Sequence, residues 1–243
     1  MTLSLIIPVY NEIDQLEFTI QKLLKLKKKI KKVEFIFIDD FSADESFNFL
    51  KNKSKKIKCI KIFRNKKKGL GSAIGEGIKK SQSKYICIFM CDLSDNINDV
   101  EIYYNKIKKD RLEAVLGSRF IKMSKVKNYP LFKLILNRFA NNIIRIIFFS
   151  DYNDFTNAFK IYEKKVLVKL FPLVSENFNI FLELPLKIIT RKYKYKIIPI
   201  NWNGRSHGVS KFKIKEIGSM YIFTLLYCFF EKILLNKKKK WKY

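Results

Sequence analysis

Short apolar runs alternate with helix-like patterns through the first half of the chain. The runs have the length of buried strands, and between them apolar residues recur at the spacing of an amphipathic helix, as at Leu16, Ile20 and Leu23. This alternation is typical of a mostly parallel sheet with helices on its faces. We therefore expect strands at residues 3–8, 33–38, 57–63, 85–90 and 114–117, joined by helices in the order βαβαβαβαβ.

The second half of the chain has a less regular pattern. The polar residues 122–129 are predicted to form a linker, and a strongly apolar helix is predicted at 131–149. A helix from 178 to about 190 and a strand ending near Ile200 should follow. Earlier in the chain, Ser42 and Glu45 have the spacing of a capping box, which predicts a helix start after the second strand.

Polar and charged residues follow the predicted strands at their carboxyl ends. Ligands of open parallel sheets bind beyond these ends. We expect the residues there to converge on one edge of the sheet and to form a site. They are Tyr10, Asn11, Glu12, Asp39, Asp40, Asp92 and Arg119.

The composition fits one catalytic domain with a short appendage. The 243 residues are 48% hydrophobic, which is enough to bury one core. The formal net charge of +28 attracts phosphate polymers. However, the lysines are scattered through nearly every segment with abundant Ile, Asn and Phe, as a bias toward A/T-rich codons produces. Since net charge governs non-specific binding rather than fold, we expect no nucleic-acid partner.

Neither a disulfide framework nor a signal peptide is predicted. The four cysteines form no CxxC pair, and residues 1–10 lack a basic region followed by a long apolar stretch, which favours the cytoplasm. The longest apolar run, 220–230, is interrupted by Glu231 and Lys232 and is shorter than the roughly 18 to 20 residues of a spanning helix. We expect an amphipathic helix at the membrane interface instead, with the basic residues 237–240 on anionic lipid.

Six motifs between about residues 3 and 212 carry a family resemblance. They are IIPVYNE at 6–12, IDDFSAD at 38–44, GLGSA at 69–73, GSRF at 117–120, DFTNAFKIY at 154–162 and RSHGVSK at 205–211. In these motifs and their order the chain resembles the family-2 glycosyltransferases, and within them the polyprenyl-phosphate sugar transferases typified by dolichol-phosphate mannosyltransferase.

The resemblance implies a domain organisation as well as a fold. The fold would be a Rossmann-like GT-A fold, an α/β architecture with a mostly parallel central sheet flanked by helices. Residues 1–211 would form the catalytic domain, with a nucleotide-sugar half at 1–121 and an acceptor half at 122–211. Residues 212–243 would form the apolar and basic segment at the membrane.

The implied donor site lies beyond the first two strands and at the glycine loop. Asp39 and Asp40 are adjacent carboxylates, which repel one another unless a ligand or donor compensates. Gly69, Gly71 and Gly75 have the spacing GxGxxxG rather than GxGxxG, so NAD is not favoured. A helix that opens after this loop would offer free N–H groups to an anion. The resemblance implies that the donor is bound by Pro8, Tyr10, Glu12, Asp39, Asp40, Gly71, Ala73, Cys91 and Ser210.

The implied metal site departs from the family pattern. The family usually has Asp-x-Asp after the fourth strand, and its carboxylates hold the divalent ion that bridges the donor diphosphate. Here the three residues are Met90, Cys91 and Asp92. Because Mg²⁺ and Mn²⁺ prefer oxygen ligands, we expect weak binding through Asp92, the diphosphate and waters, with help from Ser94 or Asp95. Cys91 is either a ligand or a packed thiol.

A basic loop and an acceptor motif complete the implied site. Arg205, Ser210 and Lys211 match the family's Arg-x-x-Gly-x-Ser-Lys loop, which folds over the donor, and their charge would neutralise the leaving diphosphate. His207 in this loop is either a general base or an ordinary loop contact. A prenyl phosphate is already an anionic nucleophile and needs no strong base.

Three further residues correspond to family positions near the acceptor phosphate or the sugar. They are Arg119, Thr156 and Lys160. Lys160 stands where relatives commonly have arginine, which keeps the charge but loses the bidentate geometry. Together with the basic loop and the metal motif, these positions give an implied catalytic set of Asp92, Arg119, Arg205 and Lys211 and an implied acceptor set of Thr156 and Lys160.

The sequence therefore predicts an inverting transferase at the cytoplasmic face of the membrane, attached peripherally. Its partners would be a nucleotide-diphosphate sugar, a polyprenyl phosphate, anionic lipid and Mg²⁺ or Mn²⁺. The two apolar helices could instead pack on the core, on a second copy of the chain or on a membrane protein. A transferase acting on a polysaccharide or protein-linked glycan, and a noncatalytic nucleotide-sugar-binding relative, remain as alternatives.

Overall fold

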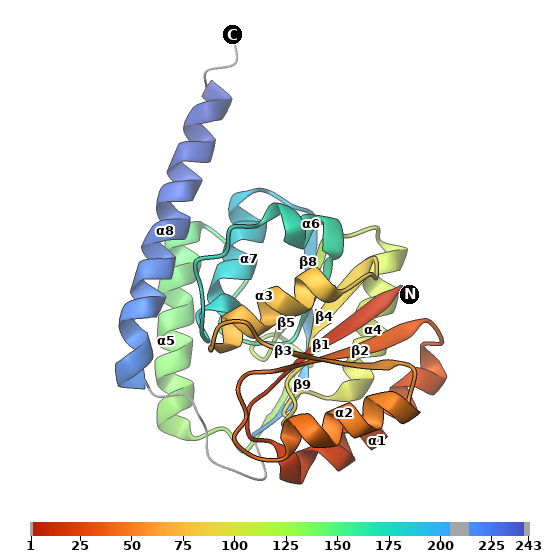
Figure 1. The fold of residues 1–243 in the computed structure, drawn as a ribbon. Helices are drawn as coiled ribbons and strands as arrows, with labels where there is room; N and C mark the ends of the chain where they lie inside the picture. The colour runs from red at the N-terminus through yellow and green to blue at the C-terminus, as the bar shows by residue number, and fades with distance from the viewer. Residues whose placement is uncertain (1, 205–213, 241–243) are drawn as a thin grey trace.

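A seven-stranded sheet forms the centre of the molecule, with helices on both of its faces (Figure 1). The computed structural model describes residues 2–204 and 214–240. The strands lie in the order β3-β2-β1-β4-β7-β5-β8, and all run parallel except β7. They are β1 Leu3–Val9, β2 Val33–Asp39, β3 Ile60–Arg64, β4 Tyr85–Ile88, β5 Ala114–Ser118, β7 Lys160–Glu163 and β8 Tyr195–Pro199. The predicted fold class is confirmed.

The helices divide the core into two layers. The apolar faces of α1 and α4 pack on one side of the sheet. Residues of α3, α5, α7 and α8 pack on the other side. Because both faces are covered, β1 and β2 are buried along their whole length, and their sequences are mostly apolar, with Ser4, Glu34 and Asp39 as the polar exceptions. The helices are α1 Ile13–Lys29, α2 Ser46–Lys56, α3 Leu70–Lys80, α4 Ile97–Lys109, α5 Leu131–Phe148, α6 Lys164–Lys169, α7 Ile180–Thr190 and α8 Ile214–Lys240.

The antiparallel strand β7 was not predicted. It lies between β4 and β5 and is buried throughout. Its sequence is only KIYE, and a strand this short with a charged residue at each end gives no apolar run. The residues of the DFTNAFKIY motif therefore lead directly into the middle of the sheet.

The prediction of a simple linker at 122–129 was wrong. Within it, β6 (Lys125–Lys127) pairs in parallel with β9 (Asn201–Asn203) in a second, two-stranded sheet. The Lys125 amide also donates to the Ile200 carbonyl at 3.1 Å. This polar segment forms a strand because it pairs with β9, which lies about 75 positions later in the chain.

The predicted capping box at Ser42 and Glu45 was also wrong. Helix α2 begins at Ser46, and Glu45 makes no side-chain capping bond. The Ser42 hydroxyl instead accepts a hydrogen bond from the Asn11 amide at 3.0 Å, and the Asp44 carboxylate accepts from the Ser46 amide at 3.0 Å. Ser42 and Asp44 accept hydrogen bonds from backbone amides that follow β1. A rule based on the spacing of two residues cannot predict such non-local bonds.

Helices α5 and α8 lie side by side and expose apolar residues (Figure 1). They meet where Phe148 packs edge-to-face on Phe229, with ring centroids 6.4 Å apart. The exposed apolar residues are Phe132, Ile135, Phe139 and Ile146 on α5, Phe149 directly after it, and Ile222, Phe223, Leu226, Phe230 and Leu234 on α8.

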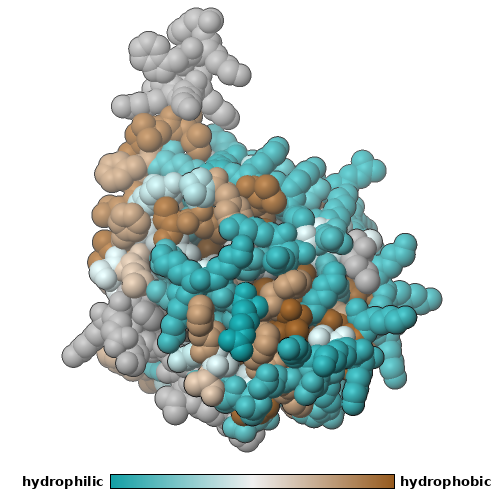
Figure 2. Space-filling model, in the orientation of Figure 1, coloured by the Kyte–Doolittle hydropathy of each residue, from teal (hydrophilic) through white to brown (hydrophobic). Residues whose placement is uncertain are grey.

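The C-terminal helix is longer and more evenly apolar than predicted. Its 18-residue window Gly218–Leu235 is apolar enough to cross a membrane by length and composition, and only 11% of that window is buried. Apolar side chains lie on both its packed and its exposed side, so it is an apolar rather than an amphipathic helix. Figure 2 shows these residues along the helix, beside a mostly hydrophilic surface.

Candidate functional site

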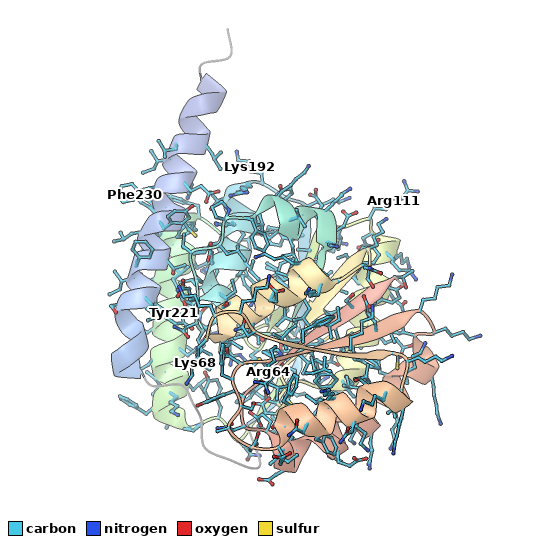
Figure 3. The ribbon with its side chains drawn as sticks, in the orientation of Figure 1. Arg64, Lys68, Arg111, Lys192, Tyr221 and Phe230 are labelled. Carbon is cyan, nitrogen blue, oxygen red and sulfur yellow. The ribbon has the colours of Figure 1, made fainter. Side chains whose placement is uncertain are left out.

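Hydrogen bonds join the loops that follow β1 and β2. Asn11 has a left-handed backbone, with φ of 51°, and its side-chain oxygen accepts from the Ala43 amide at 2.7 Å. The Glu12 amide donates to the Ser46 hydroxyl at 3.0 Å. These bonds place Tyr10 and Glu12 beside the acidic motif at the end of β2. The Lys68 ammonium lies 5.2 Å from the centroid of the Tyr10 ring, which adds a cation to this edge (Figure 3).

The Asp40 carboxylate organises the glycine loop. It accepts from the Gly69 amide at 2.8 and 3.1 Å and from the Asn65 side-chain amide at 2.8 Å. Asn65 also donates to the Gly69 carbonyl at 3.3 Å. Its side-chain amide therefore holds Gly69 at the end of the loop that begins with Asn65. The sequence analysis did not select Asn65, which lies at the end of β3, where the same strand-end argument would have found it.

Asp39 is a buried acid at the end of β2. Its side chain is 1% exposed, and neither carboxylate oxygen has a hydrogen-bond partner among the described residues. An unpaired buried carboxylate is costly to fold, so such a group in a native structure calls for an explanation, and a bound ligand is one. Pro8, which pairs with Ile38 in register, lies in the adjacent buried end of β1.

The amide groups at the start of α3 are occupied within the protein. The Gly71 and Ser72 amides donate to the Glu176 carbonyl at 2.8 and 3.2 Å, and the Ala73 amide donates to the Gly69 carbonyl at 2.9 Å. Gly71 and Ala73 are both buried. The expected set of free N–H groups for an anion is therefore replaced by a contact with the loop before α7.

The three residues of the metal motif, at positions 90–92 just after β4, have different surroundings. Cys91 is buried against α1, where its carbonyl accepts from the Thr19 hydroxyl at 2.9 Å. Met90 is half-buried and packs against the core layer on the side of the sheet that α3, α5, α7 and α8 cover. Asp92 is half-buried, and its carboxylate accepts from the Ser94 amide at 3.1 Å. Of the three motif positions, Asp92 supplies the carboxylate.

Asp95 adds a second, buried carboxyl near Asp92. One of its oxygens has no hydrogen-bond partner among the described residues. Burial, followed by the negative charge of Asp92, raises the pKa of Asp95 to about 7, against the smaller opposing effects of Arg119 and Lys160. The site therefore holds a buried carboxyl group, close to Asp92, that favours its protonated form.

Arg119 and Asp154 form a buried, bidentate ion pair. The guanidinium donates to the two carboxylate oxygens at 2.8 and 2.6 Å, and the Arg119 amide donates to the same group at 2.8 Å. Burial alone would lower the pKa of Arg119, but the charge and hydrogen bonds of Asp154 outweigh it and raise that pKa. The rings of Tyr129 and Trp202 lie 5.3 and 5.6 Å from the guanidinium carbon. The sequence analysis missed this role of Asp154.

The two proposed acceptor residues lie in different surroundings. Thr156 is half-buried, and its hydroxyl accepts from Asn137 of α5 at 2.7 Å and from Arg119 at 3.3 Å. Lys160 is 1% exposed and donates to the carbonyls of Phe155 and Asn157. Burial lowers the pKa of Lys160 to about 7, although the charge of Asp154 opposes this. Thr156 is accessible to a ligand, whereas Lys160 acts on the backbone of its own motif.

The basic loop falls outside the described residues. Arg205, His207, Ser210 and Lys211 all belong to the segment 205–213. Within the described part of the chain, no group of three His, Cys, Asp or Glu side chains is placed to hold a metal ion.

The comparisons with known proteins identify the family. The model of the family described as "Glycosyl transferase family 2" matches residues 4–171, which include every motif above except the basic loop. The chain belongs to glycosyl transferase family 2. This confirms the resemblance found in the motifs, and it agrees with the dolichol-phosphate mannosyltransferase of Pyrococcus furiosus, which is 29% identical over 222 residues. That match covers 89% of this chain and 61% of the archaeal protein, so the chain spans about three fifths of its relative's length.

Solved structures share the fold at low sequence identity. The glucosyl-3-phosphoglycerate synthase of Mycobacterium tuberculosis, solved with Mn²⁺, UDP-glucose and phosphoglyceric acid, has a TM-score of 0.71 at 13% identity, covering 94% of this chain and 79% of that one. S. aureus TarS with UDP has a TM-score of 0.65 at 14% identity, covering 96% and 66%. The fold is therefore shared with proteins whose structures were solved with UDP or UDP-glucose bound.

Proposed function

We propose that this protein transfers a sugar from a nucleotide-diphosphate sugar to a polyprenyl phosphate at the cytoplasmic membrane surface, with inversion at the anomeric carbon. The observation that carries the proposal is the position of Thr156. Its hydroxyl is bonded to Asn137 of α5, and the same helix exposes Phe132, Ile135 and Phe139. A polar group of the site thus lies directly beside a surface suited to a lipid chain.

The donor would bind along the edge formed by the ends of β1, β2 and β4. Asp39 offers two acceptor oxygens, unpartnered among the described residues, to the N–H or O–H groups of a nucleoside. Tyr10 and Glu12 would close the same pocket, and Asp40 would hold the glycine loop in place through Gly69. The nucleotide complexes of M. tuberculosis glucosyl-3-phosphoglycerate synthase and S. aureus TarS support a nucleotide-sugar donor.

A divalent ion fits the site only in a limited way. The half-buried Asp92 supplies one carboxylate, and the buried Asp95, which the charge of Asp92 reaches, has an oxygen with no hydrogen-bond partner among the described residues. Mg²⁺ often binds through one or two carboxylates together with substrate phosphates and waters, so Asp92 would hold it against the donor diphosphate, with help from Asp95. Bound there, Mg²⁺ or Mn²⁺ would neutralise negative charge on the leaving diphosphate.

The transfer itself needs little acid-base chemistry from the protein. An oxygen of the acceptor phosphate would form the new bond to the anomeric carbon, while the bond to the diphosphate oxygen breaks and the nucleoside diphosphate leaves with the electron pair. The phosphate is already ionised, so no general base is required. Arg119, held rigidly by Asp154, and Thr156 would orient the acceptor, and the basic Arg205 and Lys211 would stabilise the leaving group.

Lipid would contact the protein through α5 and α8. The two adjacent helices both expose large apolar side chains, and apolar patches of this kind mark interaction sites. The name of the P. furiosus relative, dolichol-phosphate mannosyltransferase, supports a prenyl phosphate acceptor. The same surface would serve a second copy of the chain or a membrane protein if lipid binding fails.

The test begins with a thermal-shift screen of UDP- and GDP-sugars, since a ligand of the folded state raises apparent stability. The stabilising donor is then offered a short prenyl phosphate or a soluble glycan, with and without chelator. We expect sugar on the prenyl phosphate and a large loss of transfer in Asp92→Asn. Transfer to the glycan alone would favour the polysaccharide-type enzyme. Donor binding without any turnover would favour a noncatalytic relative.

A further inference from the structure

The loop at residues 174–179, just before α7, is held first by a buried charge pair. The Glu183 carboxylate accepts from the Val174 amide at 3.0 Å and from the Ser175 amide at 2.8 Å. Glu183 is itself paired with Lys187 at 2.6 Å, and both side chains are fully buried. Within the body of the protein, the beginning of the loop is therefore fixed in position.

The same loop fixes the start of α3. The Glu176 carbonyl accepts from the amides of Gly71 and Ser72. A Cβ at Gly69 would overlap the Glu176 carbonyl oxygen, and one at Gly71 would overlap the carbonyl oxygen of Ser175. Gly69 in turn donates its amide to Asp40. The position of the loop thus determines the position of the glycine turn and of the acid that this turn binds.

A hydroxyl on α8 makes the third attachment. Thr224 is fully buried, and its hydroxyl donates to the Met220 carbonyl at 2.8 Å. Its oxygen accepts from the side chain of Asn179 at 2.9 Å and lies 3.3 Å from the Ser175 hydroxyl. Because the one hydroxyl hydrogen of Thr224 is used on Met220, Ser175 must be the donor in that pair. Thr224 therefore accepts two hydrogen bonds from the loop.

The two faces of α8 have different environments. On the packed face, the Tyr221 hydroxyl donates to the Phe178 carbonyl at 3.1 Å, beside the Thr224 bonds. On the other face, Phe230 is 59% exposed (Figure 3). Both α8 and the loop lie beyond residues 4–171, the part matched by the family model. The contacts between α8 and this loop therefore lie outside the residues that the family model matches.

We propose that Thr224 is a positioning residue for the donor site, so that the seating of α8 on the protein and the affinity for the nucleotide sugar are coupled. The inference rests on the proposed function. The connection runs from Thr224 through Ser175 and Asn179 to the Glu176 carbonyl, then to the start of α3 and to Asp40. A change in how α8 sits against the body, as lipid binding would produce, changes the donor pocket through these bonds.

The experiment replaces Thr224 by Val in the full chain, which keeps the shape and removes the hydroxyl. We expect the Kd for the nucleotide sugar to rise about tenfold, the factor that one hydrogen bond of ordinary strength represents, with kcat at saturating donor little changed. Thr224→Ser should restore the parent Kd. Ser219→Ala removes an exposed hydroxyl from the same helix and serves as the matched control.

Hydrogen exchange gives a readout that needs no donor. In Thr224→Val the amides of Gly71 and Ser72 should exchange about tenfold faster than in the parent, because their acceptor loop is released. Ser175→Ala, which keeps the backbone bond to Glu183, should give a smaller change and should not add to that of Thr224→Val. Should the parent bind no nucleotide sugar, the proposed function fails, and exchange alone then decides whether Thr224 positions α3. Unchanged exchange, or faster exchange with an unchanged Kd, would overturn the coupling.

Discussion

Met90 is the residue at which this chain departs most from the metal motif that the family resemblance implies. Its side chain packs on the core, and Asp92 alone of the three motif positions presents a carboxylate. A thioether is a poor ligand for a hard cation. The departure makes metal affinity the property in which this protein should differ most from relatives that keep both acids.

We predict that Met90→Asp lowers the Mg²⁺ or Mn²⁺ concentration for half-maximal transfer by on the order of tenfold, because a second oxygen ligand joins Asp92. The measurement is a metal titration of sugar transfer for parent and variant. If transfer needs no metal, the added carboxylate will repel the diphosphate and lower activity at every metal concentration. The two results have opposite signs, and a parent insensitive to chelator would contradict the metal assignment.

Asp95 provides a prediction for stability against pH. Its pKa is raised from 3.8 to about 7, mainly by burial and next by Asp92, so the folded state favours the protonated form. Between these two values the unfolded chain holds fewer protons at this carboxyl, and stability falls as the pH rises. Asp95→Asn should therefore be more stable than the parent at pH 8, by on the order of 4 kcal/mol, and nearly equal near pH 4. Urea unfolding at both pH values measures this, and an equal difference at both would contradict it.

At the residue scale, the sequence predicts which residues meet at the site only where they directly follow a predicted strand. Tyr10, Glu12 and Asp40 come directly after strands, and the structure places them on one edge. Asp154 is different, since it is 35 positions from Arg119 and no local pattern relates the two. For Gly71 the sequence predicted a free amide, but this amide donates to the Glu176 carbonyl, which belongs to a loop about 100 positions later.

Helix α3 offers a prediction with its own control at the level of an element. Gly71→Ala should destabilise the protein by about 2 kcal/mol or more, because the new methyl group overlaps the backbone carbonyl of Ser175. Gly75→Ala lies four positions on in the same helix and meets no atom within 4 Å. It should stabilise by about 0.5–1 kcal/mol, since alanine is the better helix former. Thermal unfolding of the two variants measures both, and equal shifts would contradict the close approach.

Elements were predictable where local sequence alone determines them. The first five parallel strands and their helices follow from apolar runs and helical spacing, and the observed ends differ by a few residues. Strands β6 and β7 were not predictable because they are short and polar and depend on partners far along the chain. The prediction of a capping box at Ser42 was wrong for the same reason, since the Ser42 hydroxyl accepts from Asn11 in a neighbouring loop.

The molecule as a whole should bind lipid through one side. Phe139 of α5 is 65% exposed, and Phe18 of α1, on a helix far from α5 in Figure 1, is 49% exposed. We predict that Phe139→Glu weakens sedimentation with anionic liposomes several-fold, because a charge opposes burial in the interface. Phe18→Glu should weaken sedimentation only by the small amount that one added negative charge on the whole protein produces. Equal losses in the two variants would indicate adsorption by net charge, and parent binding unaffected by Phe139→Glu would favour a protein partner on α5.

The place of β7 in the sheet has a consequence for how the chain is made. Strand β5 pairs with β7 and β8, which are encoded more than 40 and more than 75 positions after it. A nascent chain that ends near residue 121 therefore carries β5 without either of its neighbours, while β4 presents an open, apolar edge. Unpaired edges of this kind attract other chains. The sheet can close only late in synthesis, and a fragment of residues 1–121 released by a premature stop should aggregate rather than fold.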